Sequence, residues 1–296
     1  NTMPDRSRFV PSDEFRRSFD TQPFVFHHNL LQDELLSFPA LHRLARKAGN
    51  QEGRTSRKTI VRQPTTPGFL IAKGRGSLRW GTAEFHHALD DAFENFEESN
   101  IRLKLTAVHE YDGYRELLAE STRNLSEVTG VDFAKDYGPG IATFFIASPG
   151  ETTPYHIDEE VNFLLQIHGK KHVHIFDGND PKILSQKHLE QFWFGDCFIE
   201  QVPGSSCRTF DIEPGQGVFN PPFFPHIVET GSQACVSLSL GFARLRFFAA
   251  EVSRMNAYLR KFGWNPNPPG RRPSVDYMKS QFVRRTLSIK RSMMGS

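Results

Sequence analysis

The stretch from residue 141 to residue 242 is a succession of short strand-like runs, and this pattern limits the fold more than any other feature of the chain. Runs rich in aliphatic and aromatic residues occupy 142–147, 161–167, 172–176, 217–219 and 234–242, and glycine, proline and aspartate separate them. Several short strands with turn residues between them are typical of an antiparallel sandwich or barrel. The mouth of a barrel is a common place for a ligand site. We therefore expect a mainly β core with a site at one end.

Helical patterns lie on both sides of this stretch. Before it, Thr82 can cap one helix, and Gly130 can end a second helix over 114–128. The apolar face of the first helix is expected to comprise Phe85, Leu89, Phe93 and Phe96. After the strands, a helix that Gly263 can close is expected to carry one apolar stripe made of Leu245, Phe248, Val252, Met255 and Phe262. A last helix, capped by Ser274, follows a proline-rich linker.

These patterns divide the chain into three expected parts. Residues 1–100 form an N-terminal mixed α/β flank that packs on the core, with a short strand at 24–26 and a polar, basic loop at 51–66. Residues 101–245 form the β core, and residues 246–296 form a C-terminal helical segment. The 27 phenylalanines among 296 residues argue for a large, aromatic-rich core.

Composition excludes several classes of protein. A net charge of +2 predicts neither nucleic-acid binding nor membrane binding, and no apolar run approaches the length of a membrane span. The three cysteines, Cys197, Cys207 and Cys235, are odd in number and lack a CxxC spacing, so we expect a reducing, cytoplasmic environment. The N-terminus has no apolar signal core. The basic residues near the C-terminus are interpreted as a solvated helix face, with a nucleic-acid arm as the minority alternative.

A candidate metal site is formed by His156-x-Asp158 and a distant His226, 226 − 158 = 68 residues further on. Two imidazoles and one carboxylate are the ligand set of non-haem Fe(II) oxygenases, which leaves coordination positions open for substrates. If residues 156–158 lie in a strand, His156 and Asp158 point to the same face. A His-x-Asp tripeptide alone is weak evidence, because a surface turn with the same letters is common.

The residues around this tripeptide make the signal specific. The chain contains Thr153-Pro-x-His156-x-Asp158, then Asn162-Phe, then Gln-Ile-x-Gly-x-Lys171. This stretch resembles the JmjC and cupin-like Fe(II)/2-oxoglutarate-dependent oxygenases, and most closely the subgroup that contains the asparaginyl hydroxylase of hypoxia-inducible factor. The resemblance covers roughly residues 140–245. It implies a double-stranded β-helix, also called a jelly roll, with flanking helices.

The resemblance also implies roles for individual residues. His156, Asp158 and His226 would hold Fe(II) and leave room for 2-oxoglutarate and dioxygen. Lys171 and Thr153 would bind the distal carboxylate of 2-oxoglutarate, a pairing that a lysine can make as a point charge. Asn162 would bind near the metal-bound end.

One position departs from the subgroup. Where its members have an asparagine on the strand after the distal histidine, this chain has Gly241. Ser237 and Ser239 share the alternate face with Gly241, and Ser239 is the residue we expect to supply the missing polar group. The substrate therefore cannot be copied from that subgroup.

Two other histidines are rival ligands. His172 and His174 have the strand spacing for one face, but that face is opposite to the face of Lys171. If Lys171 points into the core, both histidines point away from it. Lys170 is the alternative to Lys171 for the interior position, because only one of the two adjacent lysines can face inward.

The function implied by the resemblance is hydroxylation of a protein or peptide side chain, coupled to decarboxylation of 2-oxoglutarate to succinate. The first alternative is a hydroxylase of a small molecule, such as an amino acid or a natural product; histone demethylation is a weaker one. An alternative from another class is a non-catalytic, cupin-like metal-binding regulatory module. The family's flanking helices often support dimerisation, so a homodimer through the C-terminal helices, with apolar Tyr277, Phe282 and Leu287, is a further expectation.

Overall fold

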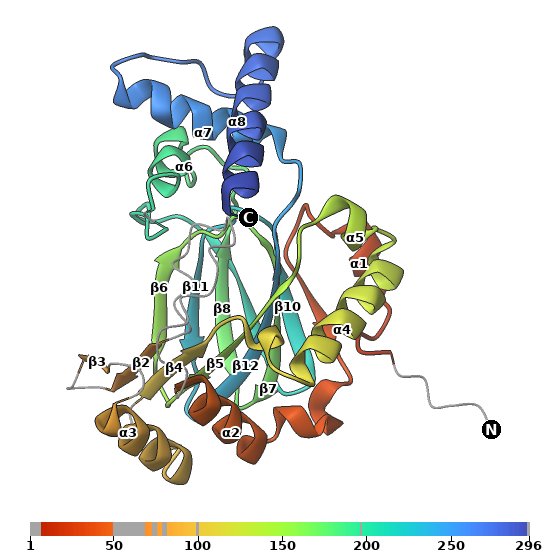
Figure 1. The fold of residues 1–296 in the computed structure, drawn as a ribbon, viewed down its shortest axis with the longest axis vertical. Helices are drawn as coiled ribbons and strands as arrows, with labels where there is room; N and C mark the ends of the chain where they lie inside the picture. Colours follow the sequence, from red (N-terminus) through yellow and green to blue (C-terminus); the bar gives the residue numbers. More distant parts are fainter. Residues whose placement is uncertain are drawn as a thin grey trace.

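The computed structural model describes residues 7–49, 69–72, 76–78, 82–98, 101–195 and 197–294. Their strands form two antiparallel sheets with helices on the outside, as the strand pattern predicted (Figure 1). The expected loop at 51–66 lies outside the described residues. Within the described residues, no helix is long and apolar enough to cross a membrane.

The larger sheet has eight strands in the order β1-β10-β7-β12-β5-β4-β2-β3. Strands from the first hundred residues extend this sheet at both of its ends, since β1 pairs with β10 and β2 pairs with β4. The bounds in chain order are β1 Phe24–His27, β2 Phe69–Ala72, β3 Gly76–Leu78, β4 Ile101–Leu105, β5 Ile141–Ala147, β7 Val161–His168, β10 Gln216–Asn220 and β12 Cys235–Phe242.

The smaller sheet has four strands in the order β6-β11-β8-β9. Three of them, β6, β9 and β11, were not distinguished as separate runs in the sequence. The bounds are β6 Thr152–His156, β8 Lys171–Phe176, β9 Cys207–Ile212 and β11 His226–Thr230. An apolar cluster between the sheets joins them: Leu164 and Val218 of the larger sheet pack with Val173, Ile175 and Phe224.

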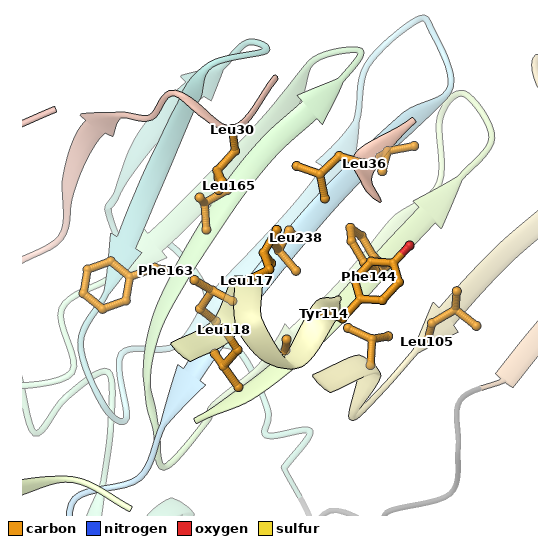
Figure 2. Close-up of a cluster of buried hydrophobic side chains, with 14 of the residues drawn as sticks. Leu30, Leu36, Leu105, Tyr114, Leu117, Leu118, Phe144, Phe163, Leu165 and Leu238 are labelled. Atoms are coloured by element: carbon orange, nitrogen blue, oxygen red, sulfur yellow. The ribbon is translucent and has the colours of Figure 1, made fainter. Parts of the chain in front are cut away.

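Helices cover the outer face of the larger sheet. Figure 2 shows Tyr114, Leu117 and Leu118 of α4 lying over Phe144 and Leu238. The helix begins after Gly113 and ends at Gly130, which has the left-handed φ of +75° expected of a helix-ending glycine. The covering helices are α1 Asp13–Arg17, α2 Phe38–Gly49, α3 Ala83–Glu94, α4 Tyr114–Thr129 and α5 Phe133–Asp136. Short 3₁₀ turns occupy η1 Leu30–Gln32, η2 Glu34–Leu36 and η3 Val108–Glu110.

The centre of this core is aromatic, as the phenylalanine content indicated. Phe163 of β7 is fully buried, and its ring centroid lies 5.0 Å from that of Phe219 and 5.8 Å from that of Phe26. Its other ring neighbours are Phe9, Phe15, Phe19, Phe133 and Phe242. The N-terminal segment is therefore part of the core that supports the strands of the larger sheet.

A helical lobe lies beyond one end of the sheets (Figure 1) and consists of α6 Gln186–Phe192, α7 Phe248–Lys261 and α8 Pro273–Met294. The apolar stripe expected along its middle helix is wrong in part. Val252 is buried, but Leu245, Phe248 and Phe262 are 43%, 41% and 78% exposed. The helix packs instead mainly through small and polar residues, among them Ala250, Ser253, Asn256 and Ala257. The last helix begins at Pro273, one residue before the expected cap.

We expect Phe163→Ala to lower the free energy of unfolding by about 3–5 kcal/mol, because the surrounding rings cannot fill the space of the lost side chain. Phe262→Ala, at a 78% exposed position after α7, serves as the control and should change it by less than about 0.5 kcal/mol. Urea denaturation of both variants measures the difference. Equal effects would contradict this description of the core.

Candidate metal and cosubstrate site

The structure brings His156, Asp158 and His226 together. One ligand atom from each residue lies within 4.8 Å of the others, and no other such group of histidine, cysteine or acidic residues occurs in the described part of the chain. Oδ2 of Asp158 is 3.7 Å from Nε2 of His156 and 3.6 Å from Nε2 of His226. Cross-strand pairing accounts for this, since His226 at the start of β11 is the register partner of His156 at the end of β6.

Asp158 reaches the group in a different way from the one predicted. Strand β6 ends at His156, so strand alternation does not continue to Asp158. Its backbone carbonyl instead accepts a hydrogen bond of 2.7 Å from the N–H of Phe223. Ile157, between the two ligands, is fully buried and donates its N–H to the carbonyl of Cys197 at 3.0 Å.

Both imidazoles are oriented by backbone carbonyls. Nδ1 of His156 lies 2.8 Å from the carbonyl of Pro154, and Nδ1 of His226 lies 3.0 Å from the carbonyl of Phe224. A carbonyl can only accept, so each Nδ1 donates its hydrogen to that carbonyl and each Nε2 is left unprotonated and able to bind a cation. Fixing the outer nitrogen of a histidine in this way is typical of metal ligands.

Electrostatics also suits His226 to metal binding. Burial and the neighbouring His156 lower the pKa of the His226 imidazole, against the opposing charge of Asp158. The ring is therefore neutral at physiological pH and needs to lose no proton to bind a cation.

The turn before His226 has a strained backbone. Phe223 has a φ of +60°, a conformation that costs a residue with a side chain roughly 1–2 kcal/mol. Its ring is buried between Phe192, Trp193 and Phe247. The sequence alone could not predict this turn, because the strain depends on contacts with distant helices.

Lys171 lies on the same face of the smaller sheet as His226. It is the register partner of Thr230, whereas His226 pairs with Ile175 on the same two strands. Its side chain is 4% exposed and crosses to the larger sheet, where Nζ lies 5.7 Å from the centroid of Phe145. In the described part of the chain, no carboxylate lies within ion-pair distance of this ammonium.

Burial lowers the pKa of Lys171 to about 8 from an ordinary value of 10.5. Its neighbour Lys170 is exposed and pairs with Glu213 at 2.5 Å. Of the two adjacent lysines, one faces the interior and one faces solvent, as strand alternation predicted. Thr153, the register partner of Val228, lies on the inward face of β6.

The remaining polar residues sit on the opposite wall, in the larger sheet. Nδ2 of Asn162 donates to the hydroxyl of Ser239 at 2.8 Å. The hydroxyl of Ser237 donates to Oε1 of Gln166 at 2.6 Å, so this serine is occupied elsewhere. Gly241 is the register partner of Asn162, which places it beside the Asn162–Ser239 pair.

Glu160 fills the space beside Gly241, and sequence reasoning missed it. A Cβ atom at position 241 would lie 3.6 Å from Oε2 of Glu160. Burial and the charges of Asp158 and Glu159 raise the pKa of the Glu160 carboxyl. The structure thus puts a carboxyl where the resembling subgroup has an asparagine amide.

The rival histidines face away from the site. His172 pairs with Asp211 at 2.6 Å on the outer face of the smaller sheet. His174 lies 2.9 Å from Oγ1 of Thr209 and 3.0 Å from Oε2 of Glu229. Both histidines are therefore held by polar partners on the outer face of the smaller sheet, as the alternation with Lys171 predicted.

Comparison with known proteins agrees with this geometry. Residues 118–248 match the family model of the JmjC domain. Among solved structures, Escherichia coli YcfD is similar with a TM-score of 0.50 at 17% identity, over 95% of this chain and 69% of that chain. A structure of YcfD described as a ribosomal oxygenase in complex with cobalt and 2-oxoglutarate gives a TM-score of 0.48 at 17% identity, over 94% and 68% of the two chains. No curated protein sequence matches. The chain therefore has a JmjC/cupin-like fold, and residues 118–248 are similar to a JmjC domain.

The pKa of Lys171 predicts a pH dependence of stability. Between about pH 8 and pH 10.5 the unfolded chain holds the lysine proton while the folded chain has released it, so the free energy of unfolding should rise with pH across this window. Lys171→Met should remove this rise and be more stable than the parent protein at pH 7. Urea denaturation without metal or cosubstrate measures it.

Lys170→Met is the matched control for this prediction, because Lys170 is exposed and adjacent. It should keep the rise between pH 8 and pH 10.5. A rise of the same size in Lys171→Met would show that the ammonium is not desolvated in the folded protein.

Proposed function

We propose that this protein is an Fe(II)- and 2-oxoglutarate-dependent dioxygenase that hydroxylates a side chain of a protein or peptide. The observation that carries the proposal is Lys171, a buried cation on the same face of the smaller sheet as His226. A buried ammonium without a counter-charge is costly, and an anionic ligand would offset this cost. A metal site with a purely structural role has no need of such a lysine.

The donor set fits iron. Two neutral imidazoles and one carboxylate are the ligands of non-haem Fe(II) oxygenases, and His156, Asp158 and His226 would hold the ion. Lys171 lies four residues along the strand pair from His226, or about 13 Å. A metal bond, a five-carbon diacid and the lysine side chain can together bridge this separation.

The other cosubstrate residues have assigned roles in this proposal. Thr153 would donate its hydroxyl hydrogen to the same carboxylate as Lys171. Asn162, paired with Ser239, would bind near the metal-bound end of the diacid. The spacing of Thr153, Asn162 and Lys171 along the chain supports a relationship to the asparaginyl hydroxylase subgroup. Glu160 beside Gly241 makes the wall formed by the larger sheet different from that of the subgroup.

Bound iron, 2-oxoglutarate and dioxygen would together supply the oxidising chemistry, in which 2-oxoglutarate is decarboxylated to succinate and one oxygen atom enters a C–H bond of the substrate. The protein's share is to orient and to exclude water. The carbonyls of Pro154 and Phe224 fix the two imidazoles, and the apolar residues between the sheets keep the lysine end of the site dry.

An exposed aromatic side chain beside the metal ligands supports a protein or peptide substrate. The ring of Phe198 is 5.9 Å from that of His156, and this phenylalanine is 55% exposed. An exposed aromatic ring at this position can pack against a large substrate. A small-molecule hydroxylase is the alternative, and Phe198 would then be a rim residue with no contact to substrate. The cytoplasmic location stays a prediction.

The proposal predicts that the purified protein with Fe(II) binds 2-oxoglutarate and slowly converts it to succinate even without substrate. Asp158→Ala should abolish this conversion while the fold persists. Lys171→Met should weaken 2-oxoglutarate binding by about 2–5 kcal/mol, because it removes one partner of a buried charge pair. Calorimetry and succinate detection provide the two measurements.

Lys170→Met should behave like the parent protein in both measurements. Absence of both 2-oxoglutarate binding and succinate would rule out the oxygenase. If Asp158→Ala unfolds instead of losing turnover, a structural metal in a non-catalytic, cupin-like module becomes the better explanation.

We also propose a homodimer formed through the helical lobe. The contact of α8 with α7 is polar, since Glu251 binds Arg284 at 2.9 Å and Asn256 binds Lys279 at 2.6 Å. Val283 of α8 is buried, but three other apolar residues of this helix are left exposed: Met278, Phe282 and Ile289 are 62%, 55% and 60% exposed. Their spacing puts them on one side of the helix, which suits burial against a second copy.

Phe282→Arg is therefore expected to convert a dimer into a monomer, because a charge would be buried in the contact. Light scattering during size exclusion measures the mass. Ser288→Arg, at an exposed position off this apolar side, is the control and should leave the mass unchanged. A monomeric parent protein would refute the dimer without affecting the oxygenase proposal.

A further inference from the structure

The two segments that carry the candidate metal ligands are both held by the helical lobe. Ile157 belongs to an apolar cluster that also contains Phe192 and Trp193 at the end of α6, and Ala250 and Ala257 of α7. Phe223 belongs to the same cluster. The lobe thus contacts the His156–Asp158 segment and the turn that leads to His226.

Phe223 contacts both the helical lobe and a candidate metal ligand. Its ring centroid lies 5.4 Å from Phe192, 5.9 Å from Trp193 and 5.7 Å from Phe247. Its backbone N–H donates to the carbonyl of Asp158 at 2.7 Å. The side chain is therefore fixed in the lobe while the main chain is bonded to a ligand residue.

The backbone of Phe223 holds this arrangement only because of the contacts around it. A phenylalanine rarely adopts a φ of +60°, and such a conformation persists where the surroundings over-determine it. Opposite the turn, the carbonyl of Phe223 packs against Gly178, where an added Cβ would approach to 2.5 Å. His226 lies only three residues after Phe223, so the position of this turn affects the position of His226.

The lobe is itself braced, so it can act as an anchor. Nε1 of Trp193 and Nε2 of Gln186 both donate to the hydroxyl of Ser253 on α7, at 3.3 Å and 3.0 Å. Glu190 of α6 pairs with Arg260 of α7 at 2.7 Å. The rings around Phe223 are thus connected to two helices that polar contacts hold together.

We propose that Phe223 is a positioning residue that couples the helical lobe to the metal centre, a proposal that rests on the proposed function. The ring sets where the turn lies, and the N–H sets where Asp158 lies relative to His226. Phe223 makes no contact with metal or cosubstrate in this role. It acts by fixing the separation of the ligands.

Binding of Co²⁺ to the metal-free protein tests the proposal without any need for substrate or turnover. Calorimetry gives the affinity, and the visible absorption band of the bound Co²⁺ reports its ligand geometry. Phe223→Ala keeps the N–H but removes the ring that fixes the turn, so the contact to Asp158 is no longer held in place. It should weaken Co²⁺ binding by about tenfold and shift the band, since disturbing an outer contact to a metal ligand has effects of this size. Phe223→Leu, which still fills the lobe, should restore most of the affinity.

Leu125→Ala is the control for a general loss of stability. Leu125 is fully buried in α4 on the outer face of the larger sheet, in a separate apolar cluster. This variant should melt at a lower temperature yet bind Co²⁺ like the parent protein. Folded Phe223→Ala with unchanged affinity and an unchanged band would overturn the proposal.

Phe247→Ala covers the case in which Phe223→Ala does not fold. It removes one of the three rings around Phe223 and leaves the Phe223 side chain itself in place, so a smaller loss of Co²⁺ affinity is expected. No loss would overturn the coupling. A parent protein that binds no Co²⁺ would overturn the proposed function itself, and the coupling with it.

Discussion

Pairing of β6 with β11 is the interaction on which the site depends. These two short strands carry no long apolar run, yet their register sets His156 against His226 and leaves Asp158 just beyond the strand end. A metal site from residues about seventy positions apart needs such a cross-strand contact, because local chain geometry cannot bring them together. The smaller sheet in turn needs the larger one, since the apolar residues between the two hold both in place.

The charged groups in the interior between the sheets differ from one end to the other. Near the end at which the ligands meet, it holds carboxyl and imidazole groups, and deeper in it holds the ammonium of Lys171 among apolar side chains. A diacid matches this order of charge, with one end at the metal and the other at the lysine. The polar wall made of Asn162 and Ser239 lies on the opposite sheet, so a bound diacid would be enclosed from both sides.

The sequence was sufficient for the features that depend on local period and short motifs. Strand alternation separated Lys171 from His172, and the turn residues located most strands of the larger sheet. It failed where distant contacts decide the outcome. The strained turn at Phe223 depends on rings from the lobe, and the stripe through Leu245 and Phe262 is exposed because α7 packs through small residues instead. Glu160 was missed because only the fold shows that it faces Gly241.

One face of strand β7 packs in the aromatic core, and its other face borders the candidate site. Phe163 and Leu165 point to the aromatic core, while Asn162 and Leu164 point between the sheets. Side chains alternate with a period of two, so the two faces can change independently by substitution. Gain or loss of one residue within the strand would exchange them. Substitutions in β7 can therefore accumulate during divergence, whereas a single-residue insertion or deletion there would disrupt the core and the proposed cosubstrate site in one event.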